Sequence, residues 1–406
     1  MRVLVVSQYY WPETFRITEV VQALRDEGCE VLVLTGQPNY PEGVPFKGYS
    51  WWSMRVEQHD GVTILRVPLF PRGDGRAIRL ALNYLSFILL ATVFGPWLLR
   101  GHSIDRVFVF GMSPILQAIP AVWLARLKKA SLITWVQDLW PESLSAAGFV
   151  HSQRVLKVVS RVVSWIYRKS DLILVQSQAF IEPVQKMAGN TPVRYHPNPG
   201  DFAFSNIKVE QECPFSFEPG FNVVFAGNMG TVQSLDAIVS AAEILRDDED
   251  IRFVMVGSGS RAEWLKSEIA RRNLANVQLP GRFPLSAMPS IMSQASALLV
   301  SLVKSPIMSQ TVPSKVQAYL AAGKPIIASL DGEGVRVILE AGAGVAAPAE
   351  DARGLADAIR DLKSRPNPEL ERMGQNARNY YEQNFEPRLL ARKLKAALAV
   401  SSKETQ

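Results

Sequence analysis

The sequence contains few of the residues that form disulfides or hold metal ions. Its 406 residues include two cysteines, Cys29 and Cys213, which lie far apart and outside any CxxC pattern. No two of the four histidines stand at metal-ligand spacing: His59, His102, His151 and His196. A disulfide framework and a zinc site therefore have no support, and the composition fits a reducing cytosol.

The N-terminus lacks the pattern of a secretory signal peptide. In MRVLVVSQYYWPE, one arginine precedes five residues typical of a buried strand, and polar aromatic residues follow. We therefore expect the chain to start folding at residue 2, which argues against an exported, two-lobed binding protein.

No tract is low in complexity, and the composition is that of a globular protein, with 48% apolar and 20% charged residues. The length exceeds one ordinary core and favours two domains of about 200 residues each. The net charge of +6 favours an anionic partner, such as a phosphorylated substrate, nucleic acid or anionic lipid.

Short apolar runs alternate with helix-sized stretches along the first half of the chain. The runs lack period-two alternation, as expected of strands covered on both faces, and the pattern predicts a parallel, doubly wound sheet. The expected strands are 3–7, 31–35, 63–67, 106–111, 132–137, 172–176 and 193–196, and the expected helices include 15–27, 114–128, 155–168 and 178–187.

The alternation fails over 197–221, which carries four prolines and is interpreted as an interdomain connection. It resumes with expected strands at 222–226, 252–256, 277–279, 297–302 and 325–329, and the tail from 369 to 400 predicts two helices separated at Pro387. We expect one domain over 1–200 together with a C-terminal helix at about 387–401, and a second domain over 201–386.

Three glycine-bearing turns follow strands of the second half: 227–231, 256–260 and 279–284. In an open α/β sheet these turns lie together at the carboxyl edge of the strands, where ligands bind. Glycines there let backbone N–H groups approach a phosphate, and a following helix N-terminus adds positive charge. Taken alone, the turn 227–231 is better explained as an ordinary connection between a strand and a helix, and it is the occurrence of three such turns in one domain that favours a ligand site.

The segment 310–327 (QTVPSKVQAYLAAGKPII) contains a second candidate phosphate contact. Pro313 suits the start of a helix, which places Ser314 and Lys315 at the helix entrance and Gly323 at its end. A lysine at that entrance can face an anion, although by itself a solvated helix lysine is the simpler explanation.

These motifs occur in an order that resembles the family 4 retaining glycosyltransferases of the GT-B fold. The resemblance covers the whole chain and rests on the opening Tyr9–Pro12, ALRDEGCEVLVLTG at 23–36, GNMG at 227, VMVGSGS at 254, LPGR at 279 and AYLAAGKPII at 318. ITWVQDLWPES at 133–143, together with SQYYWPETFRI at 7–17 and GNMGTVQSLD at 227–236, is more specifically similar to fucosamine-type transferases of bacterial O-antigen, capsule or exopolysaccharide assembly.

The resemblance implies two Rossmann-like domains facing a cleft, with a C-terminal helix crossing back to the first domain. It implies a UDP-sugar donor, N-acetyl-L-fucosamine being one candidate sugar, and a polyprenyl-diphosphate-linked glycan acceptor, with no nucleic acid. The donor-binding residues implied are Arg16, Asn228, Gly230, Thr231, Arg282, Phe283, Gln310, Ser314 and Lys315.

The sequence departs from the family pattern at four positions that usually carry charge. The acidic pair that holds the donor's ribose and sugar is replaced by Gln310 and Ala318, and the cationic pair that holds its diphosphate by Asn228 and Gln233. Lys315 and Arg16 are the candidates to replace the missing cations.

Asp138, at the end of an expected strand, and Glu142 are the candidate catalytic residues, because a carboxylate there can orient an acceptor hydroxyl or take its proton. Asp138 could instead cap the turn before Pro141. The acidic cluster 247–250 has the position of a solvated turn and not of a metal site. We therefore expect an enzyme without metal or other cofactor, in which cations and helix dipoles stabilise the leaving diphosphate, and the resemblance implies that the transfer is retaining.

Residues 80–99 contain no charged side chain and are long enough to span a bilayer. Three interpretations are open: a spanning helix, which Gly95-Pro96 should break; a fully buried core helix; and a helix that docks on a membrane. Residues 154–169 predict an amphipathic helix with basic residues on one face, which favours docking. The expected location is the cytoplasmic face of the inner membrane, peripheral or monotopic.

Two other functions stay open at this stage. A sugar-nucleotide epimerase can share the two-domain architecture but would not need the apolar segment. A non-catalytic, membrane-associated sugar-binding scaffold is compatible with the missing acidic pair and should not bind UDP.

Overall fold

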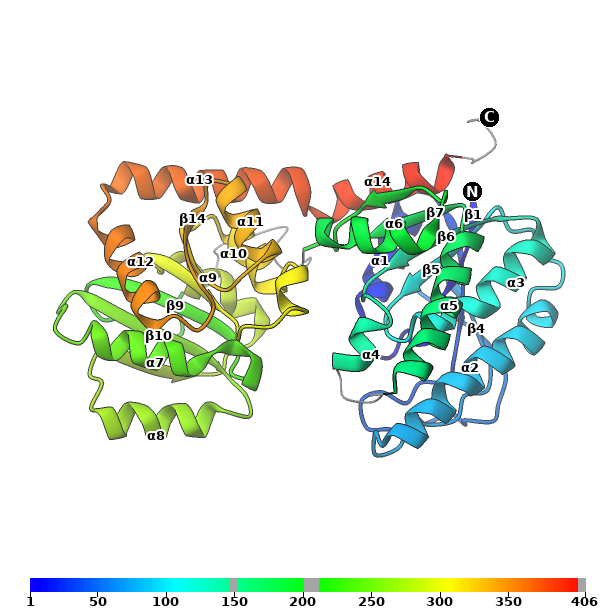
Figure 1. Cartoon of the computed structure of the whole chain (residues 1–406), viewed down its shortest axis with the longest axis horizontal. Helices are drawn as coiled ribbons and strands as arrows, with labels where there is room; N and C mark the ends of the chain where they lie inside the picture. The colour runs from blue at the N-terminus through cyan, green and yellow to red at the C-terminus, as the bar shows by residue number, and fades with distance from the viewer. Residues whose placement is uncertain (147–151, 201–211, 401–406) are drawn as a thin grey trace. The chain divides into compact units, whose positions relative to one another are not determined.

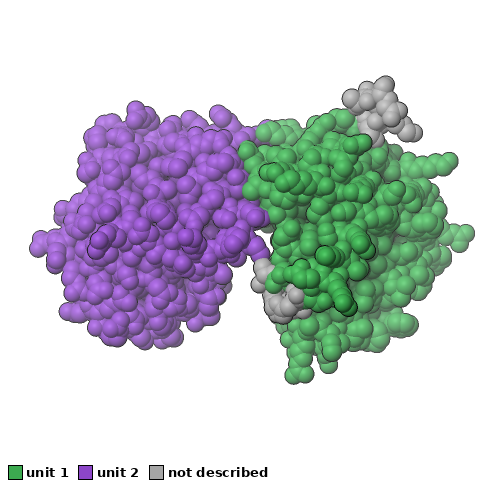
Figure 2. Space-filling view, viewed as in Figure 1, with its two compact units in different colours: residues 1–197, 390–406 green, residues 198–389 purple. Residues whose placement is uncertain are grey.

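The computed structural model describes residues 1–146, 152–200 and 212–400, and the chain divides into two compact units (Figure 1, Figure 2). Unit 1 comprises residues 1–197 and 390–406, and unit 2 comprises residues 198–389. The expected domain boundaries, at 200/201 and 386/387, lie within a few residues of these divisions. The expected connection 197–221 and the expected helix end at 401 lie partly outside the described residues.

Unit 1 contains an eight-stranded sheet in the order β3-β4-β2-β1-β5-β6-β7-β8. All neighbouring strands are parallel except β3 and β4. The strand bounds are β1 Arg2–Val6, β2 Glu30–Thr35, β3 Arg55–His59, β4 Val62–Arg66, β5 Arg106–Gly111, β6 Ser131–Val136, β7 Leu172–Val175 and β8 Val193–Tyr195. The seven expected strands are confirmed, whereas β3 was missed because this edge strand is polar and largely exposed.

Helices cover both faces of this sheet (Figure 1). One face packs against α2 Ala77–Leu98, α3 Ala118–Lys128, α5 Gln153–Lys169 and α6 Ile181–Ala188. The other packs against α1 Arg16–Asp26 and the C-terminal α14 Pro387–Ala399, whose Leu394 and Leu398 are buried. The short α4, Glu142–Ala146, follows β6.

The expectation that Gly95-Pro96 breaks the apolar segment is wrong, because α2 continues through Pro96 to Leu98. A proline removes one intrahelical hydrogen bond, and in the last turn little helix remains to be disturbed. Gly95 also has a packing reason: a Cβ there would lie 3.2 Å from a methyl group of Leu124 on α3.

Unit 2 contains a six-stranded parallel sheet in the order β11-β10-β9-β12-β13-β14. The strands are β9 Phe221–Asn228, β10 Ile251–Ser258, β11 Val277–Gly281, β12 Ala297–Ser301, β13 Ile326–Ser329 and β14 Gly344–Ala347. Helices α9 Met288–Ser293, α10 Ser314–Ala322, α11 Glu333–Glu340 and α13 Asn367–Asn384 pack on one face, and α7 Leu235–Ile244, α8 Ala262–Arg272 and α12 Ala352–Ser364 on the other. The sequence analysis missed β14, a short edge strand.

Two smaller expectations concern the tail of the chain and an acidic turn of unit 2. The separation of the tail into two helices at Pro387 is confirmed, since α13 ends at Asn384 and α14 begins at Pro387. The acidic cluster 247–250 is a mostly exposed turn, as expected, and two of its carboxylates are also paired: Asp248 lies 2.9 Å from the guanidinium of Arg360, and Asp250 lies 3.4 Å from the ammonium of Lys363. Both pairs connect the turn before β10 to α12, at the edge of the sheet opposite the glycine turns.

Candidate functional site

The ends of β9 and β10 bring two glycine turns of unit 2 side by side. Gly227 and Gly257 are register partners, with φ values of +137° and +141° that L side chains rarely adopt. A Cβ on Gly257 would lie 1.9 Å from the carbonyl oxygen of Gly227, so the two backbones meet at a distance that requires glycine. The turns are joined further by hydrogen bonds from Met229 N–H to the Ser258 carbonyl and from Arg261 N–H to the Met229 carbonyl.

Helix α10 is held against this edge by a buried tyrosine. The Tyr319 hydroxyl accepts the Ala226 N–H at 3.0 Å and approaches the Ala226 carbonyl oxygen at 3.2 Å, which fixes α10 to the end of β9. As expected, α10 begins at Ser314, directly after Pro313, and ends at Gly323 in the left-handed conformation. Lys315 lies one turn before Tyr319, on the same face of the helix.

That register places the Lys315 side chain under the first glycine turn. A Cβ on Gly227 would lie 2.7 Å from Lys315 Cε, and the ammonium lies 3.9 Å from the centre of the Phe225 ring. The ammonium also donates a hydrogen bond to Gln233 Oε1. Burial lowers the pKa of Lys315 to about 7, because removing a charge from water costs free energy.

The contact between Lys315 and Gln233 bears on the missing family cation. Gln233 occupies a position where the resemblance implies a cation, and the structure places the Lys315 ammonium directly against its side-chain oxygen. A cation is therefore present at this location, but it comes from α10 and not from the turn after β9. The sequence could suggest that Lys315 replaces the expected cation, but it could not show the contact with Gln233.

The other expected donor-site residues of unit 2 lie on the same edge of the sheet. Asn228 and Thr231 are exposed, and Gly230 is buried beside the Asn228 amide. Ser314 is exposed at the start of α10. Arg282 is exposed after β11, whereas the Phe283 ring stacks on Phe215 at 5.5 Å between centres. Gln310 ends the short helical turn Met308–Gln310 before α10.

Of the two residues that replace the acidic pair implied by the resemblance, Ala318 is partly buried and packs against the core. The structure shows a nearby carboxylate that the sequence analysis missed. Glu333 begins α11, is 8% exposed and lies 2.9 Å from the Arg336 guanidinium. Its neighbour Gly332 abuts the Ser309 carbonyl, so this carboxylate lies close in the fold to the segment that carries Gln310.

In unit 1, Asp138 follows β6 and joins it to the end of β5. Its Oδ2 atom accepts hydrogen bonds from the Ser113 N–H at 3.0 Å and the Ser113 hydroxyl at 2.8 Å. The Trp140 indole N–H donates to the same hydroxyl at 2.9 Å. Asp138 therefore does not cap the turn before Pro141; its carboxylate connects the end of β6 to the residues after β5. Within the described residues, Oδ1 makes no hydrogen bond and can accept one from a ligand.

The two remaining site candidates lie at the same carboxyl edge. Glu142 is exposed at the first residue of α4, just before the undescribed residues 147–151. Arg16 is half-buried as the first residue of α1. Arg16 belongs to unit 1 and Lys315 to unit 2, so the expectation that both hold one diphosphate stays a prediction.

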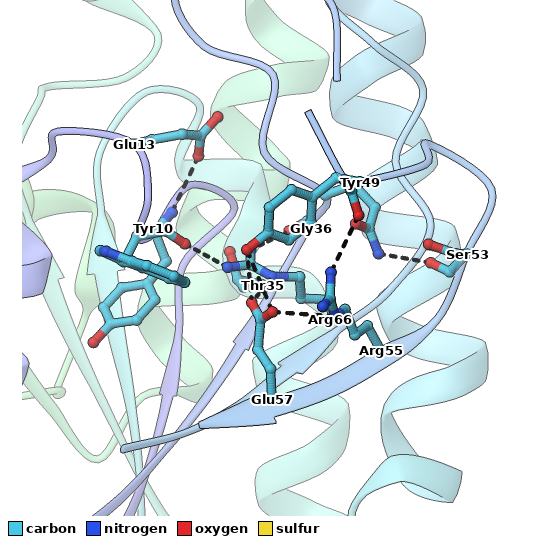
Figure 3. Close-up of polar contacts among 12 residues, drawn as sticks. Tyr10, Glu13, Thr35, Gly36, Tyr49, Ser53, Arg55, Glu57 and Arg66 are labelled. Atoms are coloured by element: carbon cyan, nitrogen blue, oxygen red, sulfur yellow. Dashed lines mark hydrogen bonds and ion pairs between the residues drawn. The ribbon is translucent and has the colours of Figure 1, made fainter. Parts of the chain in front are cut away.

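The loops at this edge are held by a buried carboxyl group that the sequence analysis missed (Figure 3). Glu13 is 4% exposed, and one of its oxygens accepts the N–H groups of Asn39 and Tyr40, both at 2.8 Å. The other accepts the Tyr10 N–H at 3.3 Å. Burial outweighs these bonds and raises the pKa of Glu13 to about 7.

A buried arginine supports the same loops from below (Figure 3). The Arg66 side chain is fully buried at the end of β4 and pairs with Glu57. It also donates to the carbonyl oxygens of Gly36, at 3.0 Å, and Trp11. Because all of these partners are protein groups, Arg66 positions the loops and is not exposed to a ligand.

Helix α2 is buried on one side only, which excludes the fully buried core helix among the three interpretations of residues 80–99. By length and composition α2 could cross a membrane, and 22% of its apolar stretch is buried in the protein. Its inner face carries Asn83, whose Oδ1 accepts from the Gln8 amide at 2.6 Å and the Tyr9 hydroxyl at 2.9 Å. These bonds fix α2 to the loop after β1, which argues against α2 leaving unit 1 to span a bilayer.

The outer surface of α2, α3 and α5 exposes large apolar side chains, and we call it the apolar surface. The three helices lie side by side over one face of the unit 1 sheet (Figure 1). The apolar surface comprises Ile78, Leu82, Leu85, Leu89, Val93, Trp97, Trp123, Leu127, Val155, Val158 and Trp165. These exposed residues lie on three adjacent helices, and apolar surfaces of this kind mark interaction sites.

Helix α5 departs from the expected division into one basic and one apolar face. Val163, Ile166 and Tyr167 are buried against the unit 1 core, whereas the flanking Val155 and Val158 are exposed. The exposed basic residues lie on the same outer side of the helix as these valines: Arg154, Lys157, Arg161 and Arg168. The helix therefore presents basic and apolar side chains together, as interfacial helices do.

Among the described residues, no three His, Cys, Asp or Glu side chains come together in a way that could hold a metal ion. Metal independence therefore stays a prediction, to be tested in solution.

Two family models match successive parts of the chain. Residues 14–199 match the glycosyl transferase 4-like domain, and residues 211–380 match the glycosyl transferases group 1. Together the two models account for most of both units.

Two curated relatives match over most of their length. The putative colanic acid biosynthesis glycosyl transferase WcaI of Escherichia coli K12 is 25% identical, over 80% of this chain and 82% of its own. The probable glycosyltransferase WbjE of Pseudomonas aeruginosa is 26% identical, over 78% and 79%. Among solved structures, Anabaena Alr3699/HepE in complex with UDP has the same fold, with a TM-score of 0.67, 12% identity and coverage of 98% and 100%.

Proposed function

This chain belongs to the family 4 glycosyltransferases of the GT-B fold, and we propose that it transfers a sugar from a UDP-sugar to a lipid-linked glycan. The observation that carries the proposal is the Lys315 ammonium beneath the glycine turn of β9, at the edge of the sheet where nucleotides bind in this class of fold.

Unit 2 would hold the donor diphosphate without a metal. As the bond between sugar and diphosphate breaks, negative charge develops on the leaving group, and fixed cations and dipoles nearby lower the barrier. Lys315 supplies the cation, and the start of α10 and the turn 227–231 supply backbone dipoles. A lysine whose pKa lies near 7 gains its full charge when the anion binds.

Unit 1 would bind the acceptor at its carboxyl edge. The Ser113 bonds hold the Asp138 carboxylate in one orientation, which leaves Oδ1 for an acceptor hydroxyl. In this position Asp138 orients the attacking oxygen or accepts its proton, and transfer proceeds with retention, as the family assignment implies. Glu142 is the second acidic group available at this edge.

The product would belong to a bacterial surface polysaccharide such as O-antigen, capsule or exopolysaccharide. Support comes from the name of the WcaI relative, which assigns that protein to colanic acid biosynthesis. Both curated relatives are named as glycosyltransferases and match along most of their chains, which favours a transferase over an epimerase or a scaffold. N-acetyl-L-fucosamine is the first sugar to test.

The apolar surface would dock the enzyme on the cytoplasmic face of the inner membrane. Buried apolar area and basic side chains both favour an anionic bilayer, and each basic residue near the surface contributes on the order of 1 kcal/mol. Docking would bring the acceptor edge of unit 1 to the plane in which a lipid-linked acceptor lies.

The test of the reaction is a product assay by mass spectrometry. Purified protein is incubated with a panel of UDP-sugars, UDP-N-acetyl-L-fucosamine first, and a polyprenyl-diphosphate-linked sugar, with and without EDTA. We expect one donor to give an extended glycan at an unchanged rate in EDTA. An epimerised nucleotide sugar without transfer would contradict the proposal, and so would the absence of UDP binding in a calorimetric titration.

The test of docking is co-sedimentation with vesicles of phosphatidylcholine and phosphatidylglycerol. Leu85 and Leu89 on α2 are 59% and 63% exposed, and Leu285 and Leu339 in unit 2 are 50% and 52% exposed, which makes a matched control. We expect L85E/L89E to lose vesicle binding and L285E/L339E to retain it. Equal binding of both variants would refute docking through α2.

A further inference from the structure

Three arginines, Arg72, Arg76 and Arg79, follow one another in the sequence at the beginning of α2, and we call them the arginine cluster. Arg76 and Arg79 have 84% and 56% of their side chains exposed, and Arg72 lies four residues before Arg76. Asp74 is the single acidic residue between 70 and 84; it lies 3.0 Å from the Arg76 guanidinium and 3.9 Å from that of Arg79. Three cations and one anion leave the cluster with a net charge of two positive units.

Arg72 is fixed to the loops at the acceptor edge of unit 1. Its backbone N–H donates to Asn39 Oδ1 at 3.0 Å, and its guanidinium lies 4.7 Å from the centre of the Tyr40 ring. Asn39 and Tyr40 are the residues whose N–H groups bind Glu13. One side of the arginine cluster is thus tied to the edge of the sheet that carries the candidate acceptor residues.

The other side of the cluster continues directly into the apolar surface. Ile78, Leu82, Leu85, Leu89 and Val93 recur at spacings of three or four residues, so they form one exposed stripe along α2. From residue 78 to residue 93 the stripe runs for roughly 22 Å at the rise of an α-helix. The order along this face is therefore acceptor loops, arginine cluster and apolar stripe.

A polyprenyl-diphosphate-linked glycan has the same order of chemical groups: sugar, diphosphate and hydrocarbon chain. Arginine is suited to the middle group, because its planar guanidinium can make paired hydrogen bonds to phosphate oxygens. A diphosphate also carries enough negative charge to match the surplus of the cluster, which a singly charged headgroup does not.

We propose that Arg72, Arg76 and Arg79 form the binding site for the diphosphate of the lipid-linked acceptor. The hydrocarbon chain follows the apolar stripe of α2, and the glycan extends toward the loops held by Glu13. This inference rests on the proposed function, since it locates the acceptor of that reaction. It separates two roles of basic residues: the α2 cluster selects the diphosphate, and the α5 residues supply general attraction to anionic lipid.

The test compares two variants that each lose three positive charges. R72Q/R76Q/R79Q removes the cluster, and R154Q/K157Q/R161Q removes the same charge from α5. Each is floated with phosphatidylcholine vesicles that contain either undecaprenyl diphosphate or an equal charge of phosphatidylglycerol. We expect the wild type to prefer the diphosphate vesicles, and the cluster variant to lose about tenfold or more of its affinity for them, because charge-assisted bonds are lost.

The α5 variant should weaken on both kinds of vesicle to a similar degree and keep the preference. Inorganic pyrophosphate, added as a competitor, should reduce wild-type binding to the diphosphate vesicles and leave the phosphatidylglycerol vesicles unaffected. A cluster variant that binds diphosphate vesicles like the wild type, or weakens equally on both, would overturn the proposal.

Two further readouts separate this inference from the proposed function. UDP binding measured by calorimetry reports on unit 2, and thermal unfolding reports on folding; the cluster variant should match the wild type in both. If the wild type transfers sugar but has no preference for diphosphate vesicles, the arginine site is wrong and the function stands. If the wild type binds no UDP, the proposed function itself fails.

Discussion

Replacing Lys315 by methionine should stabilise the ligand-free protein and weaken its affinity for the donor diphosphate. The ammonium is buried against the Phe225 ring and bonded to Gln233, and burial lowers its pKa from 10.5 to about 7. Methionine keeps the length of the side chain and removes the charge. A lysine placed there for packing alone would show no such opposition between stability and binding.

The sign and size follow from the pKa difference. Lys315 has a lower pKa in the folded than in the unfolded protein. The folded state is therefore most stable above the unfolded pKa of 10.5, and it loses stability as the pH falls from there toward the folded pKa of about 7. The shift of Lys315 corresponds to a ceiling of about 5 kcal/mol, at about 1.4 kcal/mol for each pKa unit. Lost contacts to Phe225 and Gln233 offset part of this, so we expect K315M to gain about 2 kcal/mol near pH 6.

The assays are urea unfolding and calorimetric titration with UDP, each between about pH 6 and pH 9. Above pH 7 the wild type must take up a proton to bind the diphosphate, so its Kd should rise by up to about tenfold per pH unit. Titrations in buffers of different ionisation enthalpy should show this proton uptake directly. K315M should bind at least about tenfold more weakly, with a Kd that is independent of pH in this range.

Lys324 provides the matched control. Burial also lowers its pKa, and it lies just before β13, at the opposite edge of the same sheet. K324M should therefore change stability without changing UDP affinity. The reasoning is refuted if K315M is less stable than the wild type near pH 6, or if it binds UDP as tightly as K324M does.

Three further outcomes follow from the geometry of unit 1 and the glycine turns. Glu13, whose pKa is raised to about 7, should make the wild type lose up to about 3 kcal/mol as the pH rises from about 4.5 through 7, and E13Q should lack this loss in urea titrations. Parallel pH profiles would contradict that. D138N should lower kcat by about a hundredfold or more with the donor KM nearly unchanged, whereas S113A, which removes one hydrogen bond to Asp138, should lower kcat less. G257A should destabilise unit 2 and weaken UDP binding, because its Cβ would meet the Gly227 carbonyl; unchanged melting would refute that close approach.

The sequence by itself determined the two doubly wound sheets, because buried parallel strands leave continuous apolar runs that are visible without any partner. It also determined the entrance and end of α10, since Pro313 and Gly323 act through local backbone preferences. The strands that it missed, β3 and β14, are short edge strands whose identity depends on pairing with a neighbour.

The tertiary structure alone decided what the polar side chains contact. Lys315 meets Gln233 across 82 residues of sequence, Asp138 meets Ser113 on the neighbouring strand, and Asn83 turns the inner face of an apolar helix toward the loop after β1. A local pattern gives the spacing of side chains along one element. Which distant group each side chain reaches depends on how the elements pack. The sequence could therefore identify candidate site residues, but only the fold shows what each of them contacts.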